Sequence, residues 1–177
     1  MKLLIASDIH GSAKWCSLLL QRFKEEKADK LLLLGDVLYH GPRNPLPEEY
    51  DPMGVFTMLN KIADNIIAVR GNCDSEVDQM VLGFNISSDY ATVYDGEVKL
   101  TLSHGHRAVP PLKKGDVYLT GHTHVPLNAV EVEEYIHLNP GSLSLPKEGS
   151  ERGYILYENG KFLFKTIDGK TYDERII

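Results

Sequence analysis

The first part of the chain alternates between short apolar runs and longer amphipathic segments. Residues 3–6 and 31–34 are continuous apolar runs, and each of them ends abruptly at a polar residue or a glycine. Runs of this length are typical of strands that are buried on both faces. Between the two runs, residues 15–23 place apolar side chains at helical spacing, and Ser12 is well placed to cap that helix. This strand–helix–strand order predicts a sheet that is at least partly parallel.

The same alternation continues to about residue 82. Pro52 predicts the start of a second helix, because proline is favoured at the first helical position. Residues 66–69 predict the next strand, and Ser75 predicts the start of a short helix that runs to residue 82. The Pro-rich segment 40–52 is the one long loop, and we interpret it as the rim of a site rather than as a linker.

After Asn85 the pattern changes to one that is typical of hairpins. Asp95-Gly96 and Asn159-Gly160 are two-residue turn sequences, and each separates two apolar segments. The strands expected in this half are 92–94, 97–103, 117–120, strands within 130–138 around a Glu-rich turn, 154–157 and 161–166. Parallel units followed by hairpins predict an α/β fold with two sheets packed face to face and helices outside, in one domain over residues 1–177.

The net charge indicates which partners are favourable, and the cysteine content indicates the redox environment of the protein. Nineteen basic and 25 acidic residues give a net charge of −6, which makes a nucleic acid an unfavourable stable partner. Cys16 and Cys73 are too few for a disulfide framework, and we expect free thiols in a reducing cytoplasm. The N-terminal apolar run breaks at Asp8, too early for a secretory signal, and no stretch approaches the roughly 20 apolar residues of a membrane helix.

The candidate chemistry lies where five predicted strands end. The residues that follow these strands are Asp8 and His10, Asp36, Asn72, His104, and His122 with His124. Ligands of open α/β sheets bind beyond the carboxyl ends of the strands, so these side chains are expected to converge. Any one of these motifs alone is more often a simple turn after a strand. Their recurrence after five strands instead predicts a common site.

The residue types in this set indicate metal ions bound by oxygen and nitrogen. Carboxylate, imidazole and amide without thiolate suit Mn²⁺, which we expect as the activator, and also Zn²⁺, Fe, Mg²⁺, Ni²⁺ or Co²⁺. Seven ligands exceed what one ion with open positions needs, so two divalent ions that share a carboxylate are expected. Paired ions lower the pKa of a water between them and clamp the oxygens of a phosphoryl group.

In this order, the motifs resemble the five motifs of the calcineurin-like metallophosphoesterase superfamily. They are Asp8-Ile9-His10, Gly35-Asp36, Gly71-Asn72, His104 and Gly121-His122-Thr123-His124, and Asn139-Pro140-Gly141-Ser142 also resembles this group. Within the superfamily, segments 40–44 and 68–76 are similar to those of bacterial YfcE-type phosphodiesterases. The resemblance implies a four-layered αββα sandwich with two mixed sheets and the site at one end.

The resemblance also implies roles for individual residues. One ion would be held by Asp8, His10, Asp36 and His124, and the other by Asp36, Asn72, His104 and His122, so that Asp36 bridges the two. Asn72 would also steady the charge that develops on the phosphoryl group. His40 stands at the position where protein phosphatases of the superfamily have an arginine near the substrate phosphate. Either His40 or the nearby Arg43 would therefore contact that phosphate. For His106 two interpretations remain: it supports the ligands from behind or lines the pocket, or it is simply exposed.

Cys73 departs from the usual pattern, because most members of the superfamily carry a histidine at this position, where it acts on the leaving oxygen. We interpret Cys73 as a compact neutral residue near the leaving group and expect a neighbouring carboxylate, that of Asp74, to raise the pKa of its thiol. Without the usual acid, a small phosphodiester with a good leaving group is the expected substrate. The alternatives are a general phosphomonoesterase and a non-catalytic scaffold such as the retromer subunit with this fold. A homo-oligomer, for example a dimer, stays open.

Overall fold

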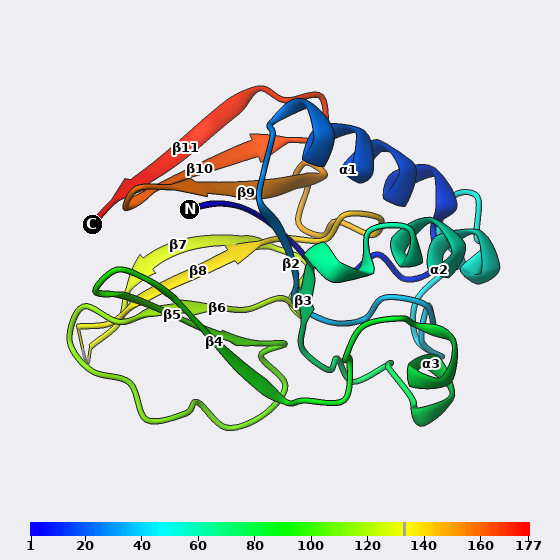
Figure 1. Ribbon diagram of the computed structural model, residues 1–177, viewed down its shortest axis with the longest axis horizontal. Helices are drawn as coiled ribbons and strands as arrows, with labels where there is room; N and C mark the ends of the chain where they lie inside the picture. The colour runs from blue at the N-terminus through cyan, green and yellow to red at the C-terminus, as the bar shows by residue number, and fades with distance from the viewer. Residues whose placement is uncertain (133) are drawn as a thin grey trace.

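The computed structural model describes residues 1–132 and 134–177, which form two mixed β-sheets packed face to face, with helices over the outer face of one sheet (Figure 1). The elements in chain order are β1 (Lys2–Ala6), α1 (Ala13–Glu25), β2 (Lys30–Leu33), α2 (Pro52–Asn60), the 3₁₀ turn η1 (Ala63–Asn65), β3 (Ile66–Ala68), α3 (Glu76–Val81), β4 (Tyr90–Asp95), β5 (Val98–Ser103), β6 (Val117–Leu119), β7 (Pro126–Val130), β8 (Ile136–Pro140), β9 (Gly153–Glu158), β10 (Lys161–Thr166) and β11 (Thr171–Ile176). The predicted α/β sandwich is confirmed.

The order of strands in each sheet explains how the candidate ligand residues at the strand ends come close together. The six-stranded sheet has the order β11-β10-β9-β1-β2-β3, and the five-stranded sheet has the order β4-β5-β6-β8-β7. Within the first sheet β1, β2 and β3 are parallel, and within the second β5, β6 and β8 are parallel. Each sheet therefore presents the carboxyl ends of three parallel strands at one of its edges. The strand–helix–strand pattern predicted this for the first sheet, whereas only hairpins were expected in the second.

Strand β1 is buried on both faces, as expected from its apolar run. Leu3 and Ile5 pack between the two sheets, whereas Leu4 and Ala6 face the helices. All four side chains are fully buried. The alternation follows from the two-residue period of a strand and gives the fold two separate apolar layers.

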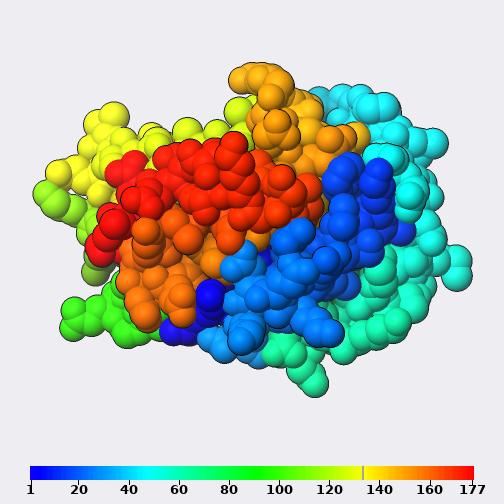
Figure 2. Space-filling view, turned by 90° about the horizontal axis from the view of Figure 1, so that it is seen from above, coloured from blue at the N-terminus to red at the C-terminus, as the bar shows by residue number. Residues whose placement is uncertain are grey.

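The helices begin where the capping residues of the sequence predicted. Ser12 Oγ accepts a hydrogen bond from Trp15 N at the start of α1, and the side chain of Asp51 accepts one from Gly54 N at the start of α2. Ser75 and Asp78 form a reciprocal capping box at α3. Helices α1 and α2 lie over the outer face of the six-stranded sheet, and α1 runs beside the hairpin of β10 and β11 (Figure 2).

Two strand predictions were wrong in detail. The region 130–138 contributes to β7 and β8, but β7 begins at Pro126 and β8 ends at Pro140. Proline has no N–H to donate to a strand ladder, so the sequence pattern did not indicate a strand that begins at Pro126. The structure tolerates this proline because it is the first residue of an edge strand. Strand β11 was missed because its residues are polar and mostly exposed, and it pairs only with β10.

Among the described residues, no helix has both the length and the apolar character required to cross a lipid bilayer.

The double burial of β1 generates a stability prediction. Ile5→Ala should lower the free energy of unfolding by about 2–5 kcal/mol, because it leaves a cavity between the two sheets. Chemical denaturation measures this difference. Val132→Ala is the control, since that side chain is 94% exposed and its truncation should change stability by about 0.5 kcal/mol or less. An equal effect of the two substitutions would contradict the packing described here.

Candidate metal centre

The residues that the sequence singled out lie at neighbouring strand ends from both sheets. Asp8 follows β1, Asp36 follows β2 and Asn72 follows β3 of the six-stranded sheet. His104 follows β5, and the loop with His122 and His124 follows β6 of the five-stranded sheet. The site is therefore built where the ends of the two sheets meet, and neither sheet carries the full set alone.

The backbone at these strand ends is unusual. Asp8, His10, Asp36, His122 and His124 all adopt positive φ, between 48° and 69°. Side chains other than glycine rarely adopt this region, which costs of order 1–3 kcal/mol per residue and occurs mostly at functional sites. The turns after β1, β2 and β6 thus hold their ligand candidates in a strained backbone conformation, whereas Asn72 and His104, after β3 and β5, are not among the residues with positive φ.

Two glycines allow the loops to approach each other closely. A Cβ atom on Gly71 would lie 2.0 Å from Asp36 Oδ1, and a Cβ atom on Gly121 would lie 1.8 Å from Ser7 Oγ. Both distances are far below contact distance, so no other residue fits without displacing the carboxylate or the strand. The glycines of the Gly-Asn and Gly-His motifs are therefore required by the packing of the site.

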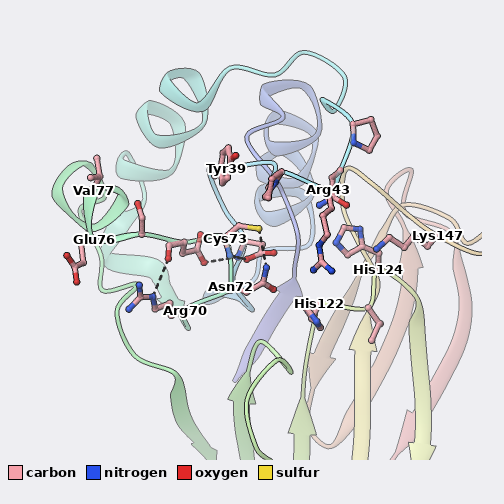
Figure 3. Close-up of a pocket in the computed structure, with 18 residues that line it drawn as sticks. Tyr39, Arg43, Arg70, Asn72, Cys73, Glu76, Val77, His122, His124 and Lys147 are labelled. Atoms are coloured by element: carbon pink, nitrogen blue, oxygen red, sulfur yellow. Dashed lines mark hydrogen bonds between the residues drawn. The ribbon is translucent and has the colours of Figure 1, made fainter.

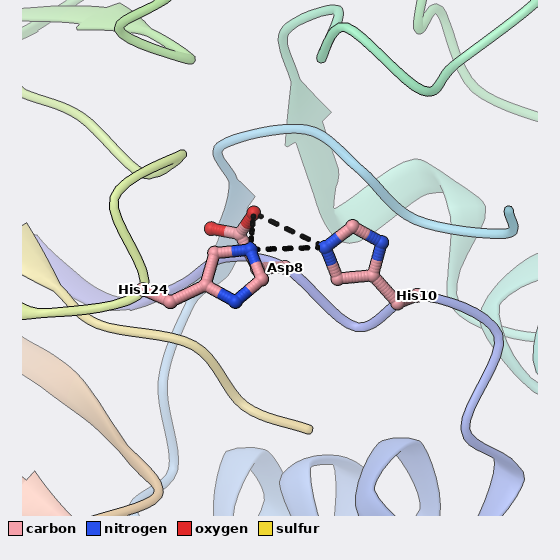
Figure 4. Close-up of side chains that lie close together, drawn as sticks. All are labelled: Asp8, His10 and His124. Carbon is pink, nitrogen blue, oxygen red and sulfur yellow. Dashed lines mark hydrogen bonds and ion pairs between the residues drawn. The ribbon is translucent and has the colours of Figure 1, made fainter. Parts of the chain in front are cut away.

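Asp8, His10 and His124 form the first half of the site (Figure 4). Asp8 Oδ1 lies 3.5 Å from His10 Nε2 and 3.2 Å from His124 Nε2, and the two Nε2 atoms are 3.2 Å apart. Asp8 is fully buried, and its Oδ1 is among the buried polar atoms without a hydrogen-bond partner in the described residues. A buried carboxylate oxygen between two imidazole nitrogens is suited to a cation.

Asp36, Asn72 and His104 form the second half. His104 Nε2 lies 3.3 Å from Asp36 Oδ2 and 3.1 Å from Asn72 Oδ1. Asp36 Oδ2 also lies 3.7 Å from His10 Nε2, so this carboxylate faces both halves. The other oxygen, Oδ1, accepts the backbone N–H of Cys73 at 2.8 Å.

Three histidines are held in the tautomer that binds metal ions. The Nδ1 atoms of His10, His104 and His124 lie 2.8, 2.7 and 2.6 Å from the carbonyl oxygens of Tyr39, Leu34 and Leu145. A carbonyl only accepts, so Nδ1 of each ring carries a proton and Nε2 faces the site, where it presents a lone pair in the neutral ring and an N–H in the protonated ring. This outer hydrogen bond is the usual support of a metal-binding histidine.

The charges of the site are strongly coupled. Burial alone would favour neutral Asp8, but the close imidazoles of His10 and His124, 3.5 and 3.2 Å from its Oδ1, outweigh burial and hold the pKa of this carboxyl well below its ordinary value. Burial would likewise favour neutral His104, but the hydrogen bond to Asp36 and the charge of Asp8 raise the pKa of this imidazole to about 9. In the metal-free protein, protonated imidazole therefore compensates the buried carboxylates.

Asp74 supports the site from behind and was not predicted in this role. Its buried carboxylate accepts backbone N–H bonds from Asp36 and Gly71, both at 2.7 Å, and from Val37 at 2.9 Å. One side chain thereby joins the loops that follow β2 and β3. Its position two residues after Asn72 was visible in the sequence, but its three bonds follow only from the folded backbone.

Two further histidines, His122 and His106, pack against this centre. The ring of His122 lies 5.0 Å from that of His104, and His122 N donates to Asp8 Oδ2 at 3.0 Å. His106 is half-buried, with its ring 5.3 Å from that of His104 and 6.1 Å from that of His122. Of the two interpretations left open for His106, the structure favours a position behind the ligands.

Cys73 lies at the edge of the centre as a neutral thiol. Burial, followed by the charge of Asp36, raises its pKa to about 12. The sequence correctly predicted a raised pKa, but Asp36 contributes more to it than Asp74, the residue named in that prediction. Asn72 Nδ2 donates to Cys73 Sγ at 3.3 Å, and Gly41 lies close above the sulfur.

A cavity of about 1220 Å³ opens over the centre (Figure 3). Its wall includes Asp36, Asn72, Cys73, His122 and His124, together with parts of the loop 39–45. Residues 41–45 therefore form part of the rim that was predicted for the segment 40–52, whereas residues 46–52 are not among those that line this cavity.

The two candidates for contact with the substrate phosphate lie differently. Arg43 lines the cavity, whereas the ring of His40 packs edge-on between those of Tyr39 and Tyr50, 4.8 and 5.1 Å away. Lys147 also lines the cavity and was missed, because it lies in a loop without a recognisable motif.

Comparison with known proteins identifies relatives over most of the chain. The family model described as the calcineurin-like phosphoesterase superfamily domain matches residues 1–161. The phosphodiesterase YfcE of Escherichia coli K12 is 48% identical over 163 residues, which cover 90% of this chain and 88% of that protein.

Solved structures agree with this result. The structure of YfcE, described as a phosphoesterase from E. coli, superposes with a TM-score of 0.95 at 43% identity and covers 100% of both chains. Vps29 from Entamoeba histolytica, solved as a zinc complex, superposes with a TM-score of 0.66 at 20% identity and covers 99% of each chain. At that identity, the second match shows the fold alone.

The raised pKa of His104 generates a pH prediction for the metal-free protein. The folded state holds a proton on His104 up to about pH 9, whereas an unfolded histidine releases it near 6.5. The stabilisation is therefore complete below about pH 6.5 and is lost as the pH rises to about 9. Burial opposes the charged form of His10, but its bonds to Asp8 outweigh burial and raise its pKa, so it acts in the same direction.

Thermal unfolding in the presence of a chelator, between pH 6.5 and pH 9, measures this effect. The melting temperature should fall across the window, and His104→Gln should make the fall smaller. A melting temperature that rises over the same window would contradict the coupling between His104 and the two carboxylates.

Proposed function

The chain belongs to the calcineurin-like phosphoesterase superfamily, and from this premise we propose that it is a phosphodiesterase that uses two divalent metal ions, with Asp36 between them. Membership makes the protein a metal-dependent phosphoesterase. The choice of diesters follows the name of the curated E. coli relative, Phosphodiesterase YfcE, and the chemistry of the residues at the centre.

One observation carries the proposal of two ions. The Nε2 atoms of His10, His104 and His124 are all presented by Nδ1 bonds to backbone carbonyls, and they converge on two buried carboxylates. One ion would be held by Asp8, His10, Asp36 and His124, and the other by Asp36, Asn72, His104 and His122. Asp36 is the member whose Oδ2 faces a histidine of each half, at 3.7 and 3.3 Å.

The chain's own residues provide position and charge. When bound, the two ions would supply a water of lowered pKa and neutralise the phosphoryl oxygens. Asn72 stands at the cavity wall beside His104, where its amide would steady developing negative charge. Arg43 is preferred to His40 for contact with the substrate phosphate, because Arg43 lines the cavity and presents a charged fork of donors.

The preference for diesters over monoesters depends on the leaving group. Cys73 stands at the position of the customary acid, and a thiol with a pKa of about 12 is a poor proton donor at neutral pH. Activated diesters need little protonation of the leaving oxygen, whereas monoesters of ordinary alcohols need more. The alternative of a non-catalytic scaffold is disfavoured, because the expected ligand positions carry Asp, Asn or His throughout.

Manganese is the proposed activator, since oxygen and imidazole nitrogen make up the donor set. Metal analysis after reconstitution should find about two equivalents per chain. Asp36→Asn should lower that number and abolish turnover, because a neutral amide cannot balance two dications. Asp64→Asn, at an exposed position on η1, is the matched control. One equivalent at saturating metal would refute the two-ion proposal.

Cys73→Ala should keep most of the activity toward an activated diester such as bis(p-nitrophenyl) phosphate, because the proposed mechanism assigns no chemistry to the thiol. Cys73→His should raise activity toward poor leaving groups, with an upper limit of about 10²–10⁴-fold for added proton transfer. Steady-state kinetics with metals saturated measure both. Complete loss of activity in a folded, metal-loaded Cys73→Ala protein would assign the thiol to the chemistry and overturn this mechanism.

A further inference from the structure

Two cationic side chains face the cavity with no protein partner. Arg43 and Lys147 both line it and are exposed, and within the described ranges neither side chain forms an ion pair or hydrogen bond. Several other basic residues of this acidic chain pair with carboxylates, namely Lys14, Arg22, Lys99 and Lys161. The cations at the cavity therefore remain available to a ligand.

The backbone holds both residues close to the metal centre. Lys147 N donates to His124 O at 3.1 Å, and Ser150 Oγ donates to Lys147 O at 2.7 Å, so this loop is anchored on a metal-ligand residue. Arg43 lies on the rim loop, where Asn44 Nδ2 donates to His40 O at 2.8 Å. Figure 3 shows Arg43 and Lys147 on the same side of the cavity, beside His124.

The opposite end of the cavity has a different character. Ser75, Glu76 and Val77 line it there, and Figure 3 shows Glu76 and Val77 far from Lys147. The end near Lys147 thus carries two unpaired cations, whereas at the other end Arg70 Nε donates to Asp74 O at 3.2 Å and lies with acidic Glu76 and apolar Val77. A diester has two ester arms, and a cavity with two unlike ends will distinguish them.

Formal charges indicate which arm the cationic end would take. Two divalent ions carry four positive charges and Asp8 and Asp36 two negative ones, and Arg43 with Lys147 raises the excess from two to four. Asp74 and Glu76 in the cavity wall lower this excess by at most two, and Arg70 in the wall raises it by one. A simple diester brings a single negative charge. A terminal phosphate on one arm brings about two more and leaves the site close to neutral.

We propose that Lys147, beside the Arg43 that contacts the scissile phosphate, is the receptor for a second phosphate group, and that the substrates are phosphodiesters with a phosphorylated arm. This proposal rests on the phosphodiesterase activity proposed above and deepens it by naming the substrate class. The Arg43 guanidinium binds the scissile phosphate through paired donors and the Lys147 ammonium adds a compact charge for the second phosphate, so the two complement each other. Lys147 acts here as a specificity residue that touches the arm and not the scissile group.

The kinetic test compares two diesters with the same p-nitrophenyl leaving group. One carries a 3-phosphopropyl arm and the other a plain propyl arm. The wild type should prefer the phosphorylated diester about tenfold in kcat/KM, as expected for one charge-assisted contact at an exposed site. Lys147→Gln should abolish most of this preference, and Lys147→Arg should restore it. Lys113→Gln, at an exposed lysine outside the cavity, should leave the preference unchanged.

A binding measurement provides a readout that does not depend on turnover. Calorimetry on the Mn²⁺-loaded protein should show that propane-1,3-diol bisphosphate binds about tenfold more tightly than propyl phosphate. Lys147→Gln should remove the difference, and Lys113→Gln should not.

The outcomes separate the receptor from the activity. Hydrolysis of both diesters at equal kcat/KM, unchanged in Lys147→Gln, would overturn the receptor and leave the proposed function intact. Bisphosphate binding that depends on Lys147, without hydrolysis of either diester, would support the receptor and refute the proposed function. Bisphosphate binding that is insensitive to Lys147 would overturn the receptor in either case.

Discussion

The burial of two carboxylates at the meeting point of the two sheets is the constraint on which the rest of the site depends. Asp8 is fully buried and Asp36 is 2% exposed, and an isolated buried charge costs far more than a domain's net stability allows. Compensation must come from groups that lie within a few ångströms. In the metal-free protein these are the imidazoles, and in the loaded enzyme that we propose they are the metal ions. The histidines thus serve folding in one state and metal binding in the other.

The geometry of the strand ends follows from the same requirement. To bring buried charges together, the chain reverses sharply after β1, β2 and β6, and it does so with aspartate and histidine at positive φ. Gly71 and Gly121 let the loops touch, and Asp74 joins two of them through three backbone bonds. The strain of these turns is offset by the packed strands behind them, which are among the most deeply buried parts of the chain.

Much of this was readable from the sequence, for a definite physical reason. The metal-ligand candidates lie in the turns that follow buried strands, and buried strands are recognisable in the sequence as apolar runs such as 31–34. Other features leave no such signal. Strand β11 is polar because it lies at the edge of its sheet. The backbone of Lys147 is held near the cavity by a hydrogen bond to His124, 23 positions earlier, and no sequence pattern indicates such a bond. The choice between His40 and Arg43 depended on aromatic packing around His40, which a linear pattern does not contain.

The central position of β1 also has a consequence for synthesis of the protein on the ribosome. Strand β1 is synthesised before all other described strands, but one of its two partners is β9, which comprises Gly153–Glu158. Until β9 has been made, an apolar strand has one unpaired edge, which favours association with other chains. The hydrogen bond between His124 Nδ1 and the carbonyl oxygen of Leu145 likewise cannot form until Leu145 has been synthesised. One edge of β1 thus stays unpaired until β9 has been synthesised, and this comes later still than the addition of Leu145.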